Sequence, residues 1–107
     1  MVSATANPDI TRELLARLWE RSLPVVRERL DVLDTAAAAT SNNALTETLR
    51  THAIAEAHKL AGSLGMFGYP EGTGFARRLE LHLEDPAPID PMRLAEDLAA
   101  LRASLSL

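Results

Sequence analysis

The stretch LTETLRTHAIAEAHKLAGSLGMF, Leu45 to Phe67, is the longest helical segment that the sequence predicts. A helix advances about 100° per residue, so five apolar side chains of this stretch fall within about 40° of one direction. They form one buried stripe, which consists of Leu49, Ala53, Leu60, Leu64 and Phe67. His58 lies almost opposite the stripe, so we expect a helix that buries one face and presents an imidazole on the other.

Gly62 and Gly65 follow His58 on its own face of this helix. Each lies within about 20–40° of the histidine direction. A glycine inside a helix lowers stability by about 1 kcal/mol relative to alanine, so two glycines beside one histidine indicate a specific requirement. One such requirement is space for a large, flat partner that approaches the imidazole. Gly65 has another interpretation, because it lies near the helix end and can permit close packing or begin that end.

Two regions before this stretch show helical periodicity. Asn7-Pro8 is a helix-start signal, and Pro24 separates residues 8–22 from residues 23–39, so they form either two helices or one kinked helix. The apolar positions are Ile10, Leu14, Leu15 and Leu18 in the first region and Val25, Val26, Leu30, Leu33 and Ala37 in the second. The polar residues 40–43 predict a loop before the long stretch.

Two more helices are expected after it. The glycines and proline of residues 68–72 predict a stop and a turn, and residues 85–88, DPAP, predict a second break. Apolar residues recur at helical spacing after each break: Phe75, Leu79 and Leu83, then Met92, Leu94, Ala95, Leu98, Leu101 and Leu105. Such helices, joined by short turns, bury their stripes together as a bundle. We predict an all-α antiparallel four-helix bundle with a short or kinked extra N-terminal helix, one domain over residues 1–107, with residues 1–7 flexible.

Composition narrows the function classes. The 107 residues carry a net charge of −4 with interspersed signs, so no basic stripe is available for nucleic acid. The absence of cysteine excludes disulfides and thiolate metal sites. No signal sequence or membrane-length apolar run is present, so we expect a cytoplasmic domain. We also expect a monomer, because each predicted helix has one apolar stripe and none is left over.

His58 is the candidate chemical group. An imidazole in water has a pKa of about 6.5, so it is partly neutral at physiological pH and can form a covalent bond to an electrophile. Lys59, the only lysine, lies one residue away, and Arg77 and Arg78 are on the next helix. If the electrophile is a phosphoryl group, either arginine could assist by lying close to it. His52 and Glu56, four residues apart, could hold a metal, but we favour a polar pair at the bundle edge because no third ligand has a fitting spacing.

Residues 57–68, AHKLAGSLGMFG, followed by residues 75–80, FARRLE, resemble the histidine-containing phosphotransfer (HPt) domain of multistep two-component relays. The resemblance covers about residues 45–84 at motif level, and the rest of the chain agrees in length and helix order. It rests on the histidine, the glycine four residues later, the small residue after it and the Ala-Arg-x-Leu-Glu run.

The resemblance implies that His58 is the phosphoacceptor, phosphorylated on Nε2 by a receiver-domain aspartyl phosphate and passing the group to another receiver. Gly62 would clear space for the receiver loop, and Ser63 would be the adjacent small polar position. Many members carry a phosphate-facing lysine three residues after the histidine, where this chain has Ala61. Lys59 is the candidate replacement, since that position is also basic in some members.

The resemblance also implies a phosphocarrier with no kinase activity of its own. The implied partners are receiver domains and a hybrid histidine kinase. The domain would bind no cofactor or metal, because the Mg²⁺ that supports transfer belongs to the receiver's acidic pocket. The sequence contains no glycine-rich nucleotide loop or acidic triad. The contribution of His58 would then be positional.

Two other functions stay open at this point. The domain could be a kinase substrate, phosphorylated on His58 by an ATP-binding domain. It could also be a helical adaptor that binds a partner through the His58 face without being phosphorylated. Substitution of His58 by glutamine would abolish labelling in the relay and kinase cases but leave partner binding normal in the adaptor case.

Overall fold

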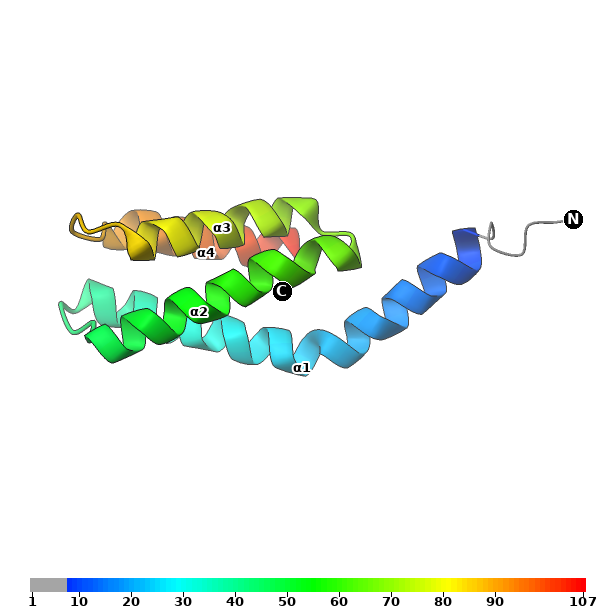
Figure 1. The fold of residues 1–107 in the computed structure, drawn as a ribbon, viewed down its shortest axis with the longest axis horizontal. Helices are drawn as coiled ribbons and strands as arrows, with labels where there is room; N and C mark the ends of the chain where they lie inside the picture. The colour runs from blue at the N-terminus through cyan, green and yellow to red at the C-terminus, as the bar shows by residue number, and fades with distance from the viewer. Residues whose placement is uncertain (1–7) are drawn as a thin grey trace, which may run out of the picture.

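The computed structural model describes residues 8–107 and is an all-α bundle (Figure 1). Its elements are α1 (Pro8–Ser41), α2 (Glu47–Ser63), the short 3₁₀ helix η1 (Leu64–Phe67), α3 (Pro70–Glu84) and α4 (Pro91–Ser104). Helix α2 packs against α1 and α3, and α4 packs against α1 and α3, so the four helices close a ring around one core. The predicted four-helix bundle is confirmed. The expected flexibility of residues 1–7 concerns residues outside this description.

The extra N-terminal helix is the first half of α1. This helix is continuous over 34 residues with Pro24 inside it, which confirms the kinked-helix alternative. Figure 1 shows α1 changing direction about halfway along, as expected where a proline removes a backbone hydrogen bond. At 1.5 Å per residue α1 is about 51 Å long, roughly twice the length of α2. Its residues 8–22, which we call the arm, therefore project beyond the bundle.

The core is built from apolar stripes spaced three and four residues apart. Its buried side chains are Val26, Leu30, Leu33 and Ala36 of α1, Ala53, Ala57, Leu60 and Ala61 of α2, Leu64, Ala76, Leu79 and Leu83 of η1 and α3, and Leu94, Leu98, Leu101 and Leu105 at the C-terminus. The predicted stripe of the long stretch is confirmed at its three central positions, with Leu49 and Phe67 partly buried at its ends.

Some predicted core positions are wrong. Met92 is 72% exposed and Ala95 is also exposed, because the buried side of α4 follows the spacing of Leu94, Leu98 and Leu101. Val25 is exposed beside the buried Val26. Three of the four apolar positions predicted in the arm, Ile10, Leu14 and Leu18, are also exposed, whereas Leu15 is partly buried.

The end of α2 sets the geometry around the histidine. Thr46 caps its start by accepting a hydrogen bond from the Leu49 amide at 3.1 Å. The α-helix ends at Ser63, four residues before the predicted end, and continues as 3₁₀ turns to Gly68, which has a φ of 86°. The Tyr69 amide then donates to the Leu64 carbonyl at 3.0 Å, which closes the helix end.

Helix α3 begins at Pro70, earlier than the periodicity from Phe75 indicates. The proline occupies the first turn, where its missing N–H costs no helical hydrogen bond. Gly72 is buried in the same turn, and a Cβ there would lie 3.1 Å from Leu105 and 3.2 Å from Leu64. This glycine therefore lets the start of α3 pack closely against η1 and the end of the chain.

Candidate functional site

His58 stands on the outer face of α2 and is held by a residue of α3. Its side chain is 75% exposed, and its Nδ1 lies 2.7 Å from Oε2 of Glu80, whose side chain is only 15% exposed. A carboxylate accepts hydrogen bonds and does not donate them, so Nδ1 carries the proton and donates it to Glu80. In the neutral ring, Nε2 then holds the lone pair on the exposed side. The predicted outward-facing imidazole is confirmed.

One contact and one close approach relate α3 to α2 and to η1, which continues it. His58 pairs with Glu80, and a Cβ on Gly65 would lie 3.6 Å from the Thr73 hydroxyl. The spacing of seven positions from His58 to Gly65 thus matches the spacing of seven from Glu80 back to Thr73, as in an antiparallel pair. By this register Arg77, three residues before Glu80, lies level with the residue three positions after His58.

The register separates the two arginine candidates. Arg77 lies about 60° around α3 from Glu80, and Arg78 lies about 160° from it. Arg77 is exposed and has no ion-pair partner among the described residues. Arg78 instead lies over the Phe75 ring, 5.4 Å from its centroid, and faces a hollow that it lines with Arg93 of α4. Only Arg77 shares the side of α3 that holds His58.

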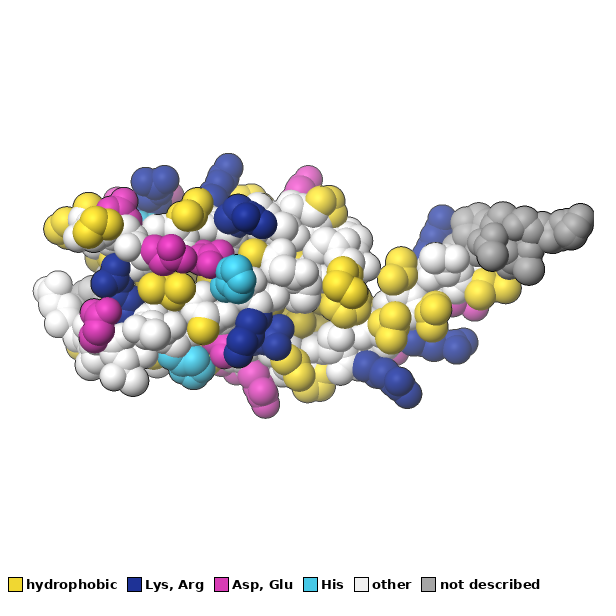
Figure 2. All heavy atoms as spheres, viewed as in Figure 1, with side chains coloured by type: hydrophobic (Ala, Val, Ile, Leu, Met, Phe, Trp, Pro, Cys, Tyr) yellow, Lys and Arg dark blue, Asp and Glu magenta, His cyan; other side chains and the backbone are white. Residues whose placement is uncertain are grey.

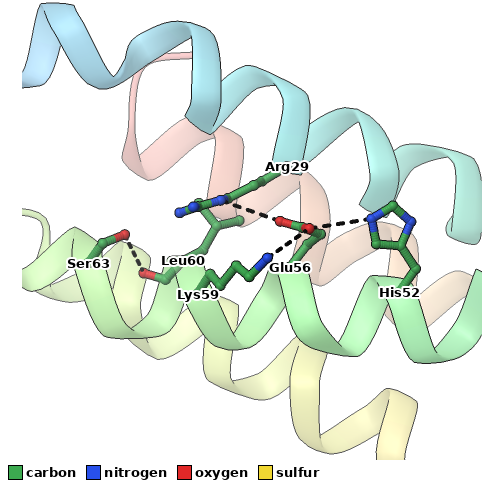
Figure 3. A network of polar contacts seen from close by, with 6 residues as sticks. All are labelled: Arg29, His52, Glu56, Lys59, Leu60 and Ser63. Atoms are coloured by element: carbon green, nitrogen blue, oxygen red, sulfur yellow. Dashed lines mark hydrogen bonds and ion pairs between the residues drawn. The ribbon is translucent and has the colours of Figure 1, made fainter.

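Lys59 belongs to a separate polar network on the side of α2 that meets α1 (Figure 3). Its Nζ lies 3.4 Å from Oε1 of Glu56, and Nε2 of His52 lies 3.3 Å from the same oxygen. Arg29 of α1 reaches the other oxygen of Glu56 at 3.3 Å. Glu56 is 9% exposed, so it is a buried carboxylate with three basic neighbours.

This network decides the interpretation of the His52–Glu56 pair. The polar pair at the bundle edge is confirmed, because Glu56 joins α1 to α2 through Arg29. In the part of the chain that the structure describes, no group of three or more His, Cys, Asp or Glu side chains could hold a metal ion.

The small residues after His58 form an open surface. A Cβ on Gly62 would meet nothing within 4 Å, so the fold itself does not require glycine there. Gly65 is also exposed, and its carbonyl accepts from the Gly68 amide at 3.2 Å in the 3₁₀ turn, which confirms that it takes part in ending the helix. Ser63 turns its hydroxyl back toward the Leu60 carbonyl at 3.5 Å (Figure 3).

Glu80 and Glu56 are not recognisable from the sequence pattern as neighbours of the candidate residues. Glu80 lies 22 residues from His58, and nothing in that spacing indicates a contact. The available signal was its place at the end of the Ala-Arg-x-Leu-Glu run. Glu56 sits one turn before Lys59, but its burial depends on Arg29, which arrives from a different helix.

Comparisons with known proteins assign the chain to a family. The family described as "Hpt domain" matches residues 17–105. The curated "Protein RcaC" of Microchaete diplosiphon is 34% identical over 77 residues, which cover 72% of this chain and 12% of that protein. No solved structure matches at a significant level. Among residues 8–107, no helix is long and apolar enough to cross a membrane. Because the family match covers most of the chain, this protein belongs to the Hpt domain family.

Proposed function

We propose that this domain accepts a phosphoryl group on Nε2 of His58 from the aspartyl phosphate of a receiver domain and passes it to another receiver. Hpt domains are phosphotransfer modules of two-component phosphorelays. The observation that carries the proposal is the exposed imidazole whose Nδ1 is held by Glu80 at 2.7 Å. That hydrogen bond presents the nucleophilic nitrogen outward.

The chemistry requires little from this chain beyond orientation. The lone pair of Nε2 attacks the phosphorus in line, the N–P bond forms as the P–O bond to the aspartate breaks, and the electron pair leaves with the aspartate carboxylate. The proton stays on Nδ1, so the phosphorylated ring of His58 is cationic. Glu80 stabilises that charge because it already accepts the Nδ1 proton. The same steps in reverse deliver the group to the next receiver.

Arg77 is the basic residue that we assign to the phosphoryl group. Many family members carry a lysine where this chain has Ala61, and the α2–α3 register puts Arg77 level with that position. The other candidates are engaged elsewhere, since Glu56 holds Lys59 and Arg78 lies over Phe75. Lys59 is a weaker candidate because it is paired with Glu56. It stays a candidate because its side chain is 53% exposed and can leave that carboxylate.

The surface formed by Gly62, Ser63 and Gly65 is where we place the approaching receiver loop. Open space around Gly62 supports this, because a partner can come close to the helix backbone there. The receiver would supply the Mg²⁺, and the domain itself would bind no cofactor and phosphorylate nothing from ATP. We place the exchange in the cytoplasm. A hybrid histidine kinase is a further candidate partner.

A labelling experiment tests the proposal. The purified domain and a His58→Gln variant are incubated with a panel of phosphorylated receivers, with a histidine kinase and ATP, and with ATP and Mg²⁺ alone. Acid-labile phosphate on the wild type from a receiver, and none on His58→Gln, supports the relay. Label from the kinase alone would make the domain a kinase substrate. No label from any donor, with the fold intact, would contradict a phosphocarrier and favour an adaptor.

A further inference from the structure

The arm of α1 carries an apolar stripe that the rest of the described chain leaves uncovered. Leu14 is 53% exposed and Leu18 is 41% exposed, and with Ile10 at 62% they follow one another at four-residue spacing. Figure 2 shows hydrophobic and basic side chains together at the surface of this projecting segment. A helix of about 15 residues is marginal by itself in water. Such a stripe is typical of a helix that packs against a partner.

The arm is oriented by a contact on another side of the same helix. The Trp19 ring lies 4.6 Å from the Tyr69 ring and 5.5 Å from the Phe67 ring, centroid to centroid, at the end of the bundle. Trp19 lies about 100–140° around the helix from Leu18 and Leu14. The aromatic contact therefore joins the base of the arm to the bundle while the apolar stripe faces away from it.

The charges of the arm indicate what the partner is. Residues 8–22 contain three acidic and three basic residues, so the arm is neutral although the whole chain carries −4. Glu13 and Arg17 flank the stripe on one side, and among the described residues neither has an ion-pair partner. In an antiparallel pair of identical helices the same flank meets itself, so Glu13 of each copy lies within one turn of Arg17 of the other. The arm is thus complementary in charge to a second copy of itself.

We propose that the arms of two copies pair antiparallel along this stripe and make the domain a dimer. A twofold axis at Leu14 puts that residue beside its counterpart and places Ile10 opposite Leu18 of the second copy. Two Glu13–Arg17 ion pairs then border the seam. The sequence-based expectation of a monomer rested on the absence of a leftover apolar stripe, and the exposure of Leu14 and Leu18 contradicts that premise.

Sedimentation equilibrium over a concentration series tests the dimer. We expect the wild type to move from the 11.6 kDa chain mass toward twice that value as concentration rises. The double variant Leu14→Glu/Leu18→Glu should stay at the chain mass, because its two stripes repel. Ala16→Glu is the control: it adds one negative charge, where the double variant adds two, to an exposed residue on the other side of the arm, and it should dimerise like the wild type. A wild type that stays at the chain mass, or a double variant that dimerises as well as the control, overturns the proposal.

Cysteine cross-linking tests the orientation, because the natural chain contains no cysteine. Ile10→Cys and Leu18→Cys proteins are mixed and oxidised gently. An antiparallel pair predicts that the mixed 10–18 disulfide dominates, since these positions face each other within bonding reach. Dominant 10–10 and 18–18 disulfides would show a parallel pair and contradict the proposed geometry. Cross-links no more frequent than those of Ala16→Cys would contradict pairing along the stripe.

Discussion

Nδ1 of His58 lies 2.7 Å from Oε2 of Glu80, across the interface between α2 and α3. The His58 side chain is three-quarters exposed and the Glu80 side chain is largely buried. A carboxylate fixed in the interface therefore orients a ring that is open to solvent. An ion pair with so exposed a partner adds little to stability. The hydrogen bond matters for chemistry, because it determines which ring nitrogen of His58 carries the proton and which one keeps a lone pair.

Glu80→Gln should slow phosphotransfer by about 10-fold or more, the order of effect seen when a group that orients a functional histidine is lost. The amide can neither match the carboxylate charge nor fix the tautomer. Nitrogen-15 NMR of the His58 ring checks the cause, because the wild type should show the proton on Nδ1 and the variant a mixture. Glu84→Gln, an exposed carboxylate one turn further along α3, is the control. Equal transfer rates in both variants would remove Glu80 from the mechanism.

Arg77→Ala should slow transfer, and Arg78→Ala should leave the rate within about twofold of the wild type. The reason is geometric: Arg77 shares the side of α3 that holds His58, whereas Arg78 lies over Phe75. Arg77→Lys, which keeps the charge, should recover much of the rate. Lys59→Ala should slow transfer less than Arg77→Ala, since Glu56 already holds that ammonium group. Rapid-quench kinetics with one receiver measures all four, and a reversed order of Arg77 and Arg78 would contradict the assignment.

Gly62 offers a test that separates stability from transfer. Gly62→Ala should raise the free energy of unfolding by up to about 1 kcal/mol, because a helix favours alanine and the added Cβ meets open space. Gly62→Gln should keep the fold but obstruct the receiver. The control is Gly74→Gln, which adds the same side chain at an exposed, open position of α3. Transfer by Gly62→Gln at the rate of Gly74→Gln would show that clearance is not its role.

Glu56→Ala should lower the free energy of unfolding by about 1–3 kcal/mol, because it leaves Arg29 without the carboxylate that joins α1 to α2. Urea denaturation measures the change. Glu47→Ala is the comparison, since Glu47 is 80% exposed in its pair with Arg50 and should cost less than about 1 kcal/mol. If the two variants were equally stable, the Glu56 network would not contribute to the fold.

The sequence predicted what depends on helical periodicity. The spacing of Ala53, Leu60 and Leu64 determined the buried side of α2 and η1 and hence the exposure of His58. Contacts between helices could not be predicted from periodicity, because the pairing of His58 with Glu80 depends on the register of α2 against α3.

The arm shows the other limit. Leu14 and Leu18 recur at the same spacing as core residues, so their sequence pattern does not distinguish a bundle position from a projecting one. The length of α1 relative to its neighbours determines that these positions project beyond the bundle. Pro24 by itself was compatible with either one helix or two.

The most direct test of phosphotransfer through His58 locates the phosphoryl group on the ring. The domain is phosphorylated by a receiver, and phosphorus-31 and nitrogen-15 NMR of His58 identify the bonded nitrogen. We expect a phosphoryl group on Nε2, with the proton still on Nδ1 beside Glu80. A phosphoryl group on Nδ1, or one on any residue other than His58, would contradict it.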